Sequence, residues 1–193
     1  MNKKKILLLS FFLVVLVQLY VPSKMIWDKE EVLQTGTEYK FRTAPIDPND
    51  PFRGKYITLR FDNNIVNTPS EQDWKVGESI YVSMTTDDKG FAKIESVSKE
   101  RPKEKHEFIK ATVRSVLETN PKSLTIDYPF DRYYMEESKA YEAEQTYRES
   151  HRDTDKPTYA VVSIKNGNAV LKDVMIDGTS IREIVKARQQ ESK

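Results

Sequence analysis

The chain has 193 residues but no cysteine, only two histidines, and six scattered glycines. Without cysteine there can be no disulfide, thiolate metal site or cysteine nucleophile. His106 and His151 both lie in polar segments, which does not favour a zinc or haem site. No glycine-rich phosphate loop and no GxSxG elbow is present. The sequence therefore predicts no metal, no cofactor and no recognisable catalytic motif.

An excess of basic charge is also lacking. The formal net charge is +1, and Lys3, Lys4 and Lys5 precede the first acidic residue, Asp28. Beyond those three lysines the acidic residues slightly outnumber the basic ones. A nucleic-acid-binding domain would normally concentrate basic charge on its folded part. We therefore expect no nucleic-acid partner.

One long hydrophobic run is present, at the N-terminus. Residues 6–21 follow the three lysines, and a helix over this run would span about 24 Å. A bilayer core is about 30 Å thick, and Met25, Ile26 and Trp27 extend the run. The positive-inside rule keeps the lysines in the cytoplasm. We predict a single-pass signal anchor over residues 1–27 in the cytoplasmic membrane, and an extracytoplasmic domain over residues 28–193.

A cleaved signal peptide is the alternative to an anchor. The best cleavage candidate is Val21-Pro22-Ser23, but it places a proline between its small residues, and no A-x-A pattern exists. The apolar run is also slightly longer than a usual signal-peptide core. We favour the anchor.

The remainder of the chain alternates between apolar and polar residues, as strands do. The alternating sets are Tyr39/Phe41/Thr43, Ile57/Leu59/Phe61, Ile80/Val82/Met84, Ile109/Ala111/Val113, Leu124/Ile126/Tyr128 and Ala160/Val162/Ile164. Turn residues separate several of them, at 87–90, at 120–121 and at Asn166-Gly167, which is a strong hairpin signal. We predict an α+β, mainly β domain of seven or eight strands, built as an antiparallel barrel or sandwich.

Helical signals are few in this domain. Residues 136–149 carry Ala140, Ala143 and Tyr147 at helical spacing, with Glu144 four residues before Arg148. They predict one helix packed on the sheet. The tail after Ser180 is also helix-prone and is expected to fray.

A stiff corner precedes the second predicted strand, which covers residues 55–61. The residue types at 47–51, Asp-Pro-Asn-Asp-Pro, are typical of turns. Proline fixes φ, and acidic side chains accept hydrogen bonds from nearby backbone amides. Arg53 can pair with either aspartate, and Gly54 permits a close backbone approach. The corner is either purely structural or a preformed recognition rim, and the physics of the residues alone favours the structural interpretation.

Aromatic residues gather around Arg132, at Tyr128, Phe130, Tyr133 and Tyr134. Alternation would bury one face of this strand and expose the other. Either Tyr133 or Tyr134 should therefore point outward, where a tyrosine can contact a binding partner. The simpler interpretation is a strand packed beneath the helix.

These residues resemble a known family. Residues 54–61 read GKYITLRF, which is similar to the signature that names the GDYXXLXY proteins: Gly54, Tyr56 and Leu59 match, whereas Lys55 and Phe61 depart from it. The approach through 45–53 and the block from Arg132 to Glu144 also resemble the family. The resemblance implies a bacterial membrane-anchored protein without an established activity, and a polytopic membrane protein as its partner.

We hypothesise a protein-interaction module that docks a membrane or envelope protein. Its candidate binding residues are Asp47, Asp50, Arg53, Gly54, Tyr56, Leu59, Tyr133, Tyr134, Glu137 and Glu144. The alternative is a cell-envelope enzyme or ligand-binding domain that uses the corner from Asp47 to Tyr56. Lys55 counts against catalysis there, because any role of the motif aspartate is lost at that position.

Overall fold

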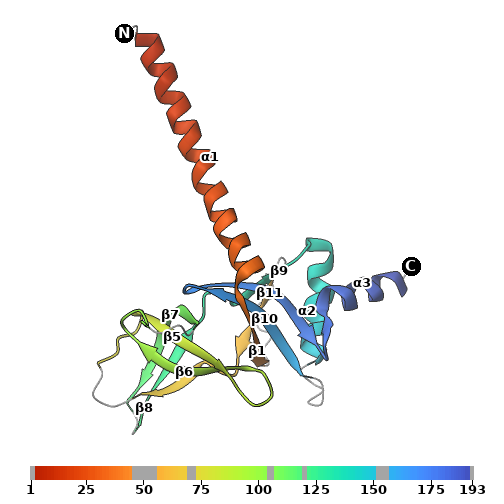
Figure 1. Ribbon diagram of the computed structural model, residues 1–193. Helices are drawn as coiled ribbons and strands as arrows, with labels where there is room; N and C mark the ends of the chain where they lie inside the picture. Colours follow the sequence, from red (N-terminus) through yellow and green to blue (C-terminus); the bar gives the residue numbers. More distant parts are fainter. Residues whose placement is uncertain are drawn as a thin grey trace.

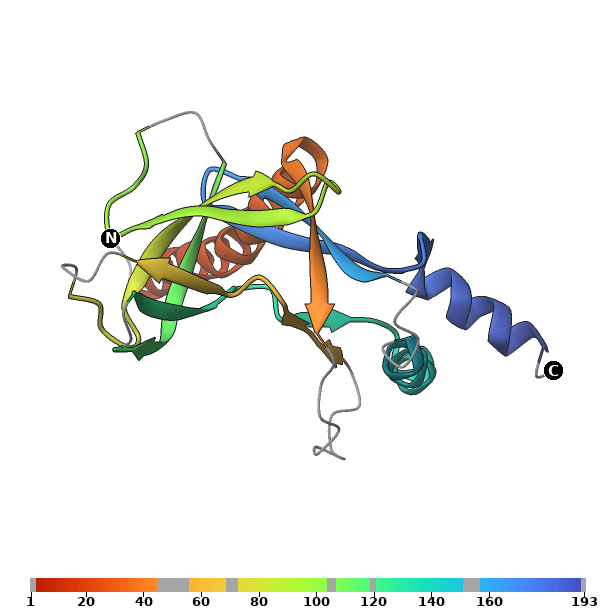
Figure 2. The same cartoon turned by 90° about the horizontal axis from the view of Figure 1, so that it is seen from below.

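The computed structural model describes residues 3–44, 56–68, 73–103, 107–118, 121–150 and 157–191. A long N-terminal helix stands away from a β-rich domain, and two further helices lie together at one end of that domain (Figures 1 and 2). The elements are α1 (Lys3–Thr35), β1 (Thr37–Ala44), β2 (Tyr56–Thr58), β3 (Arg60–Phe61), β4 (Ile65–Thr68), β5 (Ser79–Thr86), β6 (Ala92–Ser98), β7 (Phe108–Leu117), β8 (Lys122–Asp127), β9 (Arg132–Tyr134), α2 (Glu137–Ser150), β10 (Thr158–Lys165), β11 (Asn168–Ile176), β12 (Thr179–Ser180) and α3 (Ile181–Glu191). The predicted mainly β, α+β class is confirmed.

Helix α1 is a single 33-residue rod, about 50 Å long. It is long and apolar enough to cross a membrane. It continues through Pro22 to Thr35, eight residues beyond the end of the predicted anchor at residue 27. The sequence signal stops at Trp27 because the later turns are polar, whereas the helix continues with ion pairs such as Lys24–Asp28, at 2.8 Å.

The last turns of α1 are fixed to the first large sheet. Val32 is buried, and Lys165 Nζ on β10 donates to both Glu31 Oε1 and Thr35 Oγ1 at 2.7 Å. Gly36 closes the helix through a 2.9 Å bond from its N–H to Val32 O. Helix and domain are therefore joined without a flexible linker, as Figure 1 shows.

That sheet has the strand order β12-β11-β10-β1-β3. The hairpin of β10 and β11 turns at Asn166 and Gly167, whose φ angles of 52° and 87° fit a type I′ turn. This hairpin was predicted from the Asn-Gly pair and is confirmed. A bulge between Val161 and Val162 shifts the register of the pair.

A second five-stranded sheet, in the order β4-β8-β7-β5-β6, curls against the first to form a nearly closed barrel. Backbone contacts join the sheets at two places: Lys40 of β1 bridges Phe91 beside β6, and Lys110 N of β7 donates to Gly167 O at 3.0 Å. The predicted turn at Asp87–Gly90 is present, with Asp87 Oδ1 accepting the N–H groups of Lys89 and Phe91.

Aromatic side chains fill the region where the two sheets meet. Phe41 is completely buried, and its ring lies 5.6, 5.4 and 5.1 Å from those of Phe61, Tyr128 and Phe130. Edge-to-face pairs of this kind add stability beyond the area that they bury. Tyr128 and Phe130 are therefore core residues, and they pack between the sheets.

Helices α2 and α3 cover the end of the domain opposite β5–β8 (Figure 2). The predicted helix at 136–149 is confirmed as α2, with Ala143 and Tyr147 buried. The C-terminal helix is also present, but Ile181 and Val185 are completely buried, so its first turns are packed. The predicted C-terminal helix is therefore packed on the domain in addition to α2, because α3 has an apolar face of its own.

One predicted strand is divided. The continuous strand expected over residues 55–61 separates at Leu59 into β2 and β3, which belong to different sheets. Alternation shows which side chains are buried, but it does not show which strand each segment pairs with. The predicted turn at 120–121 lies partly outside the described residues.

Candidate functional site

The family-like stretch connects two sheets. β2 pairs with β9 in the register Tyr56↔Tyr134, Ile57↔Tyr133 and Thr58↔Arg132. Leu59 then donates its N–H to Asp131 O at 2.7 Å, and its side chain is buried. Phe61 joins β1 in the first sheet. The stretch therefore ties the β2–β9 ribbon to the barrel through backbone bonds and buried side chains.

The outward face of the ribbon carries two tyrosines and an arginine. The rings of Tyr56 and Tyr134 lie 5.4 Å apart, and the Arg132 guanidinium carbon lies 5.2 Å from the centre of the Tyr56 ring. Tyr134 is 60 % exposed. We name this group the Tyr56–Arg132–Tyr134 cluster. It offers a partner flat apolar area together with a positive charge.

Arg132 interacts with its neighbours on the ribbon. Its interaction with the Tyr134 side chain, followed by those with Tyr56 and Asp131, raises the pKa of Arg132. Asp131 Oδ1 lies 3.9 Å from the Arg132 Nε atom.

The inward face of the ribbon carries a partly buried hydrogen-bond network. The hydroxyl of Tyr133 donates to Asp173 Oδ1 at 2.6 Å and accepts from Arg182 Nε at 2.5 Å. Burial, followed by the bond to Asp173, raises the pKa of Tyr133, so the hydroxyl stays protonated and can donate. The network joins β9 to β11 and α3 and so fixes the position of the ribbon.

Replacing Tyr133 with phenylalanine should lower the free energy of unfolding by about 1–3 kcal/mol. The substitution removes one donor and one acceptor and leaves Asp173 and Arg182 without this partner. Urea unfolding of the full chain in detergent, followed by near-ultraviolet circular dichroism, measures the loss. Tyr134→Phe is the matched control and should cost less than about 0.5 kcal/mol, because its side chain is exposed.

A hollow of about 420 Å³ lies beside the cluster, between the start of α2 and α3. Its lining residues are Tyr134, Met135, Glu136, Lys139, Arg182, Glu183 and Lys186. Lys139 bonds Glu136 at 2.7 Å, and this bond lowers the pKa of Glu136. A carboxylate held in its ionised form is poorly suited to act as a general acid.

The structure brings together part of the predicted site. Tyr56 and Tyr134 meet in the cluster, whereas Leu59 lies in the core. Tyr133 points inward and Tyr134 points outward, which settles the choice that the sequence left open. Glu137 starts α2. Glu144 pairs with Arg148 at 2.9 Å within α2 and does not line the hollow.

The four corner residues, Asp47, Asp50, Arg53 and Gly54, lie outside the described residues. Sequence reasoning noted Arg132 but did not place it in the site, and it missed Asp173 and Arg182. No local pattern marks those two, because they reach Tyr133 only through contacts 40 and 49 residues apart in the chain. Among the described residues no group of three or more histidine, aspartate or glutamate side chains could hold a metal ion.

The architecture defines a class: a β-rich domain carried on one N-terminal helix long and apolar enough to span a membrane. The chain belongs to the GDYXXLXY protein family, whose match covers residues 18–174. The family assignment from the sequence is therefore confirmed. No curated protein sequence and no solved structure matches the chain.

Proposed function

We propose that this protein is a membrane-anchored docking module. Helix α1 crosses the cytoplasmic membrane, the β-rich domain lies outside the cytoplasm, and the Tyr56–Arg132–Tyr134 cluster contacts a polytopic membrane protein. The resemblance to the family suggests this kind of partner, since its members are often encoded beside such proteins.

The surface of α1 supports the anchor. Its large apolar side chains are exposed to their surroundings, including Leu7 at 77 % and Trp27 at 74 %. Lipid would cover such a surface, whereas its exposure to water would be unfavourable. Lys3, Lys4 and Lys5 precede this segment, and the positive-inside rule places them in the cytoplasm.

The exposed cluster carries the docking proposal. Tyrosine and arginine are enriched among residues that dominate binding energy at protein interfaces. Here they stand together on a short ribbon whose other face is anchored by the Tyr133 network. The rigid joint at Lys165 and Gly36 also limits how far the cluster can move relative to the membrane.

Site-specific photo-crosslinking in native membranes tests this proposal. A photoreactive amino acid at Tyr134 should give one dominant adduct with a membrane protein, and Arg132→Ala should reduce its yield severalfold. Ile65 on β4 is the matched control position, because it is 58 % exposed but belongs to another sheet. Equal adducts from both positions, or none from Tyr134, would contradict docking through the cluster.

A further inference from the structure

We infer that α1 pairs, within the membrane, with α1 of a second copy of this chain, through a seam centred on Gln18. The inference rests on the proposed membrane span. It concerns the membrane segment, and it is independent of the cluster on the β2–β9 ribbon.

Gln18 is the only residue with a carboxamide between Ile6 and Trp27. Its side chain is exposed on the rod, and the described part of the chain offers it no hydrogen-bond partner. An unbonded amide costs several kcal/mol in an apolar medium. Hydrogen bonds between helices are one way in which such groups are satisfied in a bilayer.

The backbone adds a second unsatisfied group at the same level. Pro22 lies inside α1 and has no N–H, so it cannot donate to the carbonyl of Gln18 four residues earlier. Each copy therefore presents an amide with two donors and one acceptor, together with a backbone carbonyl whose usual donor is missing.

Gln18 cannot easily reach water. It lies six residues before Lys24, about 9 Å along the helix from that charged end. Side chains on a helix tilt toward its N-terminus, so the amide of Gln18 leans away from the Lys24 end and toward the bilayer centre. A glutamine is also too short to extend to the interface as lysine and arginine do.

Gln18 belongs to a regular seam. Residues Leu7, Phe11, Val14, Gln18, Val21 and Met25 follow one another at alternating spacings of four and three. This is the heptad spacing of two helices that pack in a left-handed pair, which is also the common geometry in membranes. In this register Gln18 takes an a position, where a single polar residue can specify the register and the oligomeric state of a helix pair.

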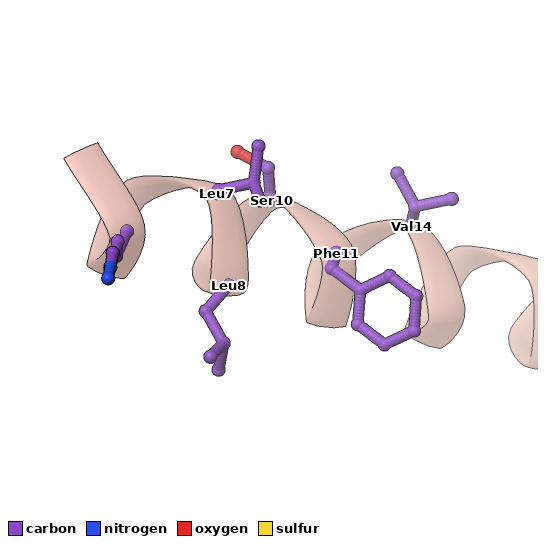
Figure 3. A pocket seen from close by; sticks show the side chains of 6 residues that line it. Leu7, Leu8, Ser10, Phe11 and Val14 are labelled. Carbon is purple, nitrogen blue, oxygen red and sulfur yellow. The ribbon is translucent and has the colours of Figure 1, made fainter.

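The structure shows a socket on this seam. A shallow hollow on α1 is lined by six residues, and four of them belong to one turn-spanning set, Leu7, Ser10, Phe11 and Val14; the other two are Lys4 and Leu8. These four positions are i, i+3, i+4 and i+7, the arrangement that receives one side chain of a facing helix. Figure 3 shows these side chains along the helix, with Leu7, Ser10 and Val14 pointing up in the view and Phe11 and Leu8 lying below.

A second copy fits these groups better than an unrelated helix. Two copies insert in the same direction, so both Gln18 residues lie at the same depth. A carboxamide is self-complementary, because each can donate to the other and to the other's free backbone carbonyl. Both copies also bring the same seam, as a symmetric pair requires.

Cysteine crosslinking of the purified full chain in liposomes tests the pairing. The chain has no cysteine of its own, so single substitutions give an unambiguous signal. Val14→Cys and Val21→Cys should form at least fivefold more disulfide-linked dimer than Leu16→Cys. Leu16 is a matched control, because it is similarly exposed and only two residues from Val14, but it lies on the far side of the helix.

Gln18→Leu in the Val14→Cys background should reduce the dimer about three- to tenfold, and Gln18→Asn should preserve most of it. Equal crosslinking at all positions, a maximum at Leu16, or no effect of Gln18→Leu would overturn the inference. So would dimers that form only with a different protein in native membranes. Flotation separates the two proposals: if the chain floats with the liposomes but does not crosslink, only the pairing fails, whereas a chain that does not float contradicts the anchor itself.

Discussion

Phe41→Ala should lower the free energy of unfolding by about 3–5 kcal/mol, the range for a large buried aromatic side chain. Phe41 is completely buried and makes edge-to-face contacts with Phe61, Tyr128 and Phe130. The backbone there is held by β10 on one side and β3 on the other, so collapse around the cavity should be limited.

Urea unfolding of the full chain in detergent measures this effect. Tyr134→Ala is the control, since it removes an equally large aromatic side chain from the surface and should cost less than about 1 kcal/mol. Comparable losses for the two variants would mean that the contacts around Phe41 do not hold the two sheets together.

Gly36→Ala should weaken the joint between α1 and the domain, at a cost of about 1–3 kcal/mol. A Cβ at position 36 would lie 2.5 Å from Val32 O and 3.0 Å from Ile164 O. Both neighbours are backbone atoms, so relief requires α1 or β10 to move. Such a movement should also disturb the bonds from Lys165 to Glu31 and Thr35.

Hydrogen exchange distinguishes a loosened joint from general destabilisation. In Gly36→Ala the amides of the last turn of α1 should exchange at least tenfold faster than in the parent chain, while those of β5 and β7 change less. Gln34→Ala, an exposed substitution in the same turn, should leave both regions unchanged. Unaltered exchange in Gly36→Ala would show that this close approach does not fix the helix to the sheet.

The sequence predicted much of the fold because its main signals are local. Alternation located the buried faces of the strands at Phe41, Val82 and Ile126, and Asn166-Gly167 located a hairpin through its demand for positive φ. The same alternation did not reveal the division at Leu59. That division depends on which strands β2 and β3 pair with, and these lie far away in the chain.

The site was predicted less well, for the same physical reason. The motif residues Leu59 and Phe61 are core residues. A sequence motif can therefore mark residues that stabilise the fold as readily as residues that bind a partner. The Tyr56–Arg132–Tyr134 cluster forms only when β2 pairs with β9, and the Tyr133 network requires β11 and α3 to close on the ribbon. Neither arrangement leaves a signal within a short window of sequence.

Labelling of single cysteines in intact cells tests most directly the proposal that the domain lies outside the cytoplasm. Val76 is 68 % exposed on the domain, and Lys5 precedes the apolar run of α1. If the domain lies outside the cytoplasm, a membrane-impermeant maleimide should label Val76→Cys in intact cells, but should label Lys5→Cys only after lysis. Labelling of Val76→Cys only after lysis would contradict this position of the domain.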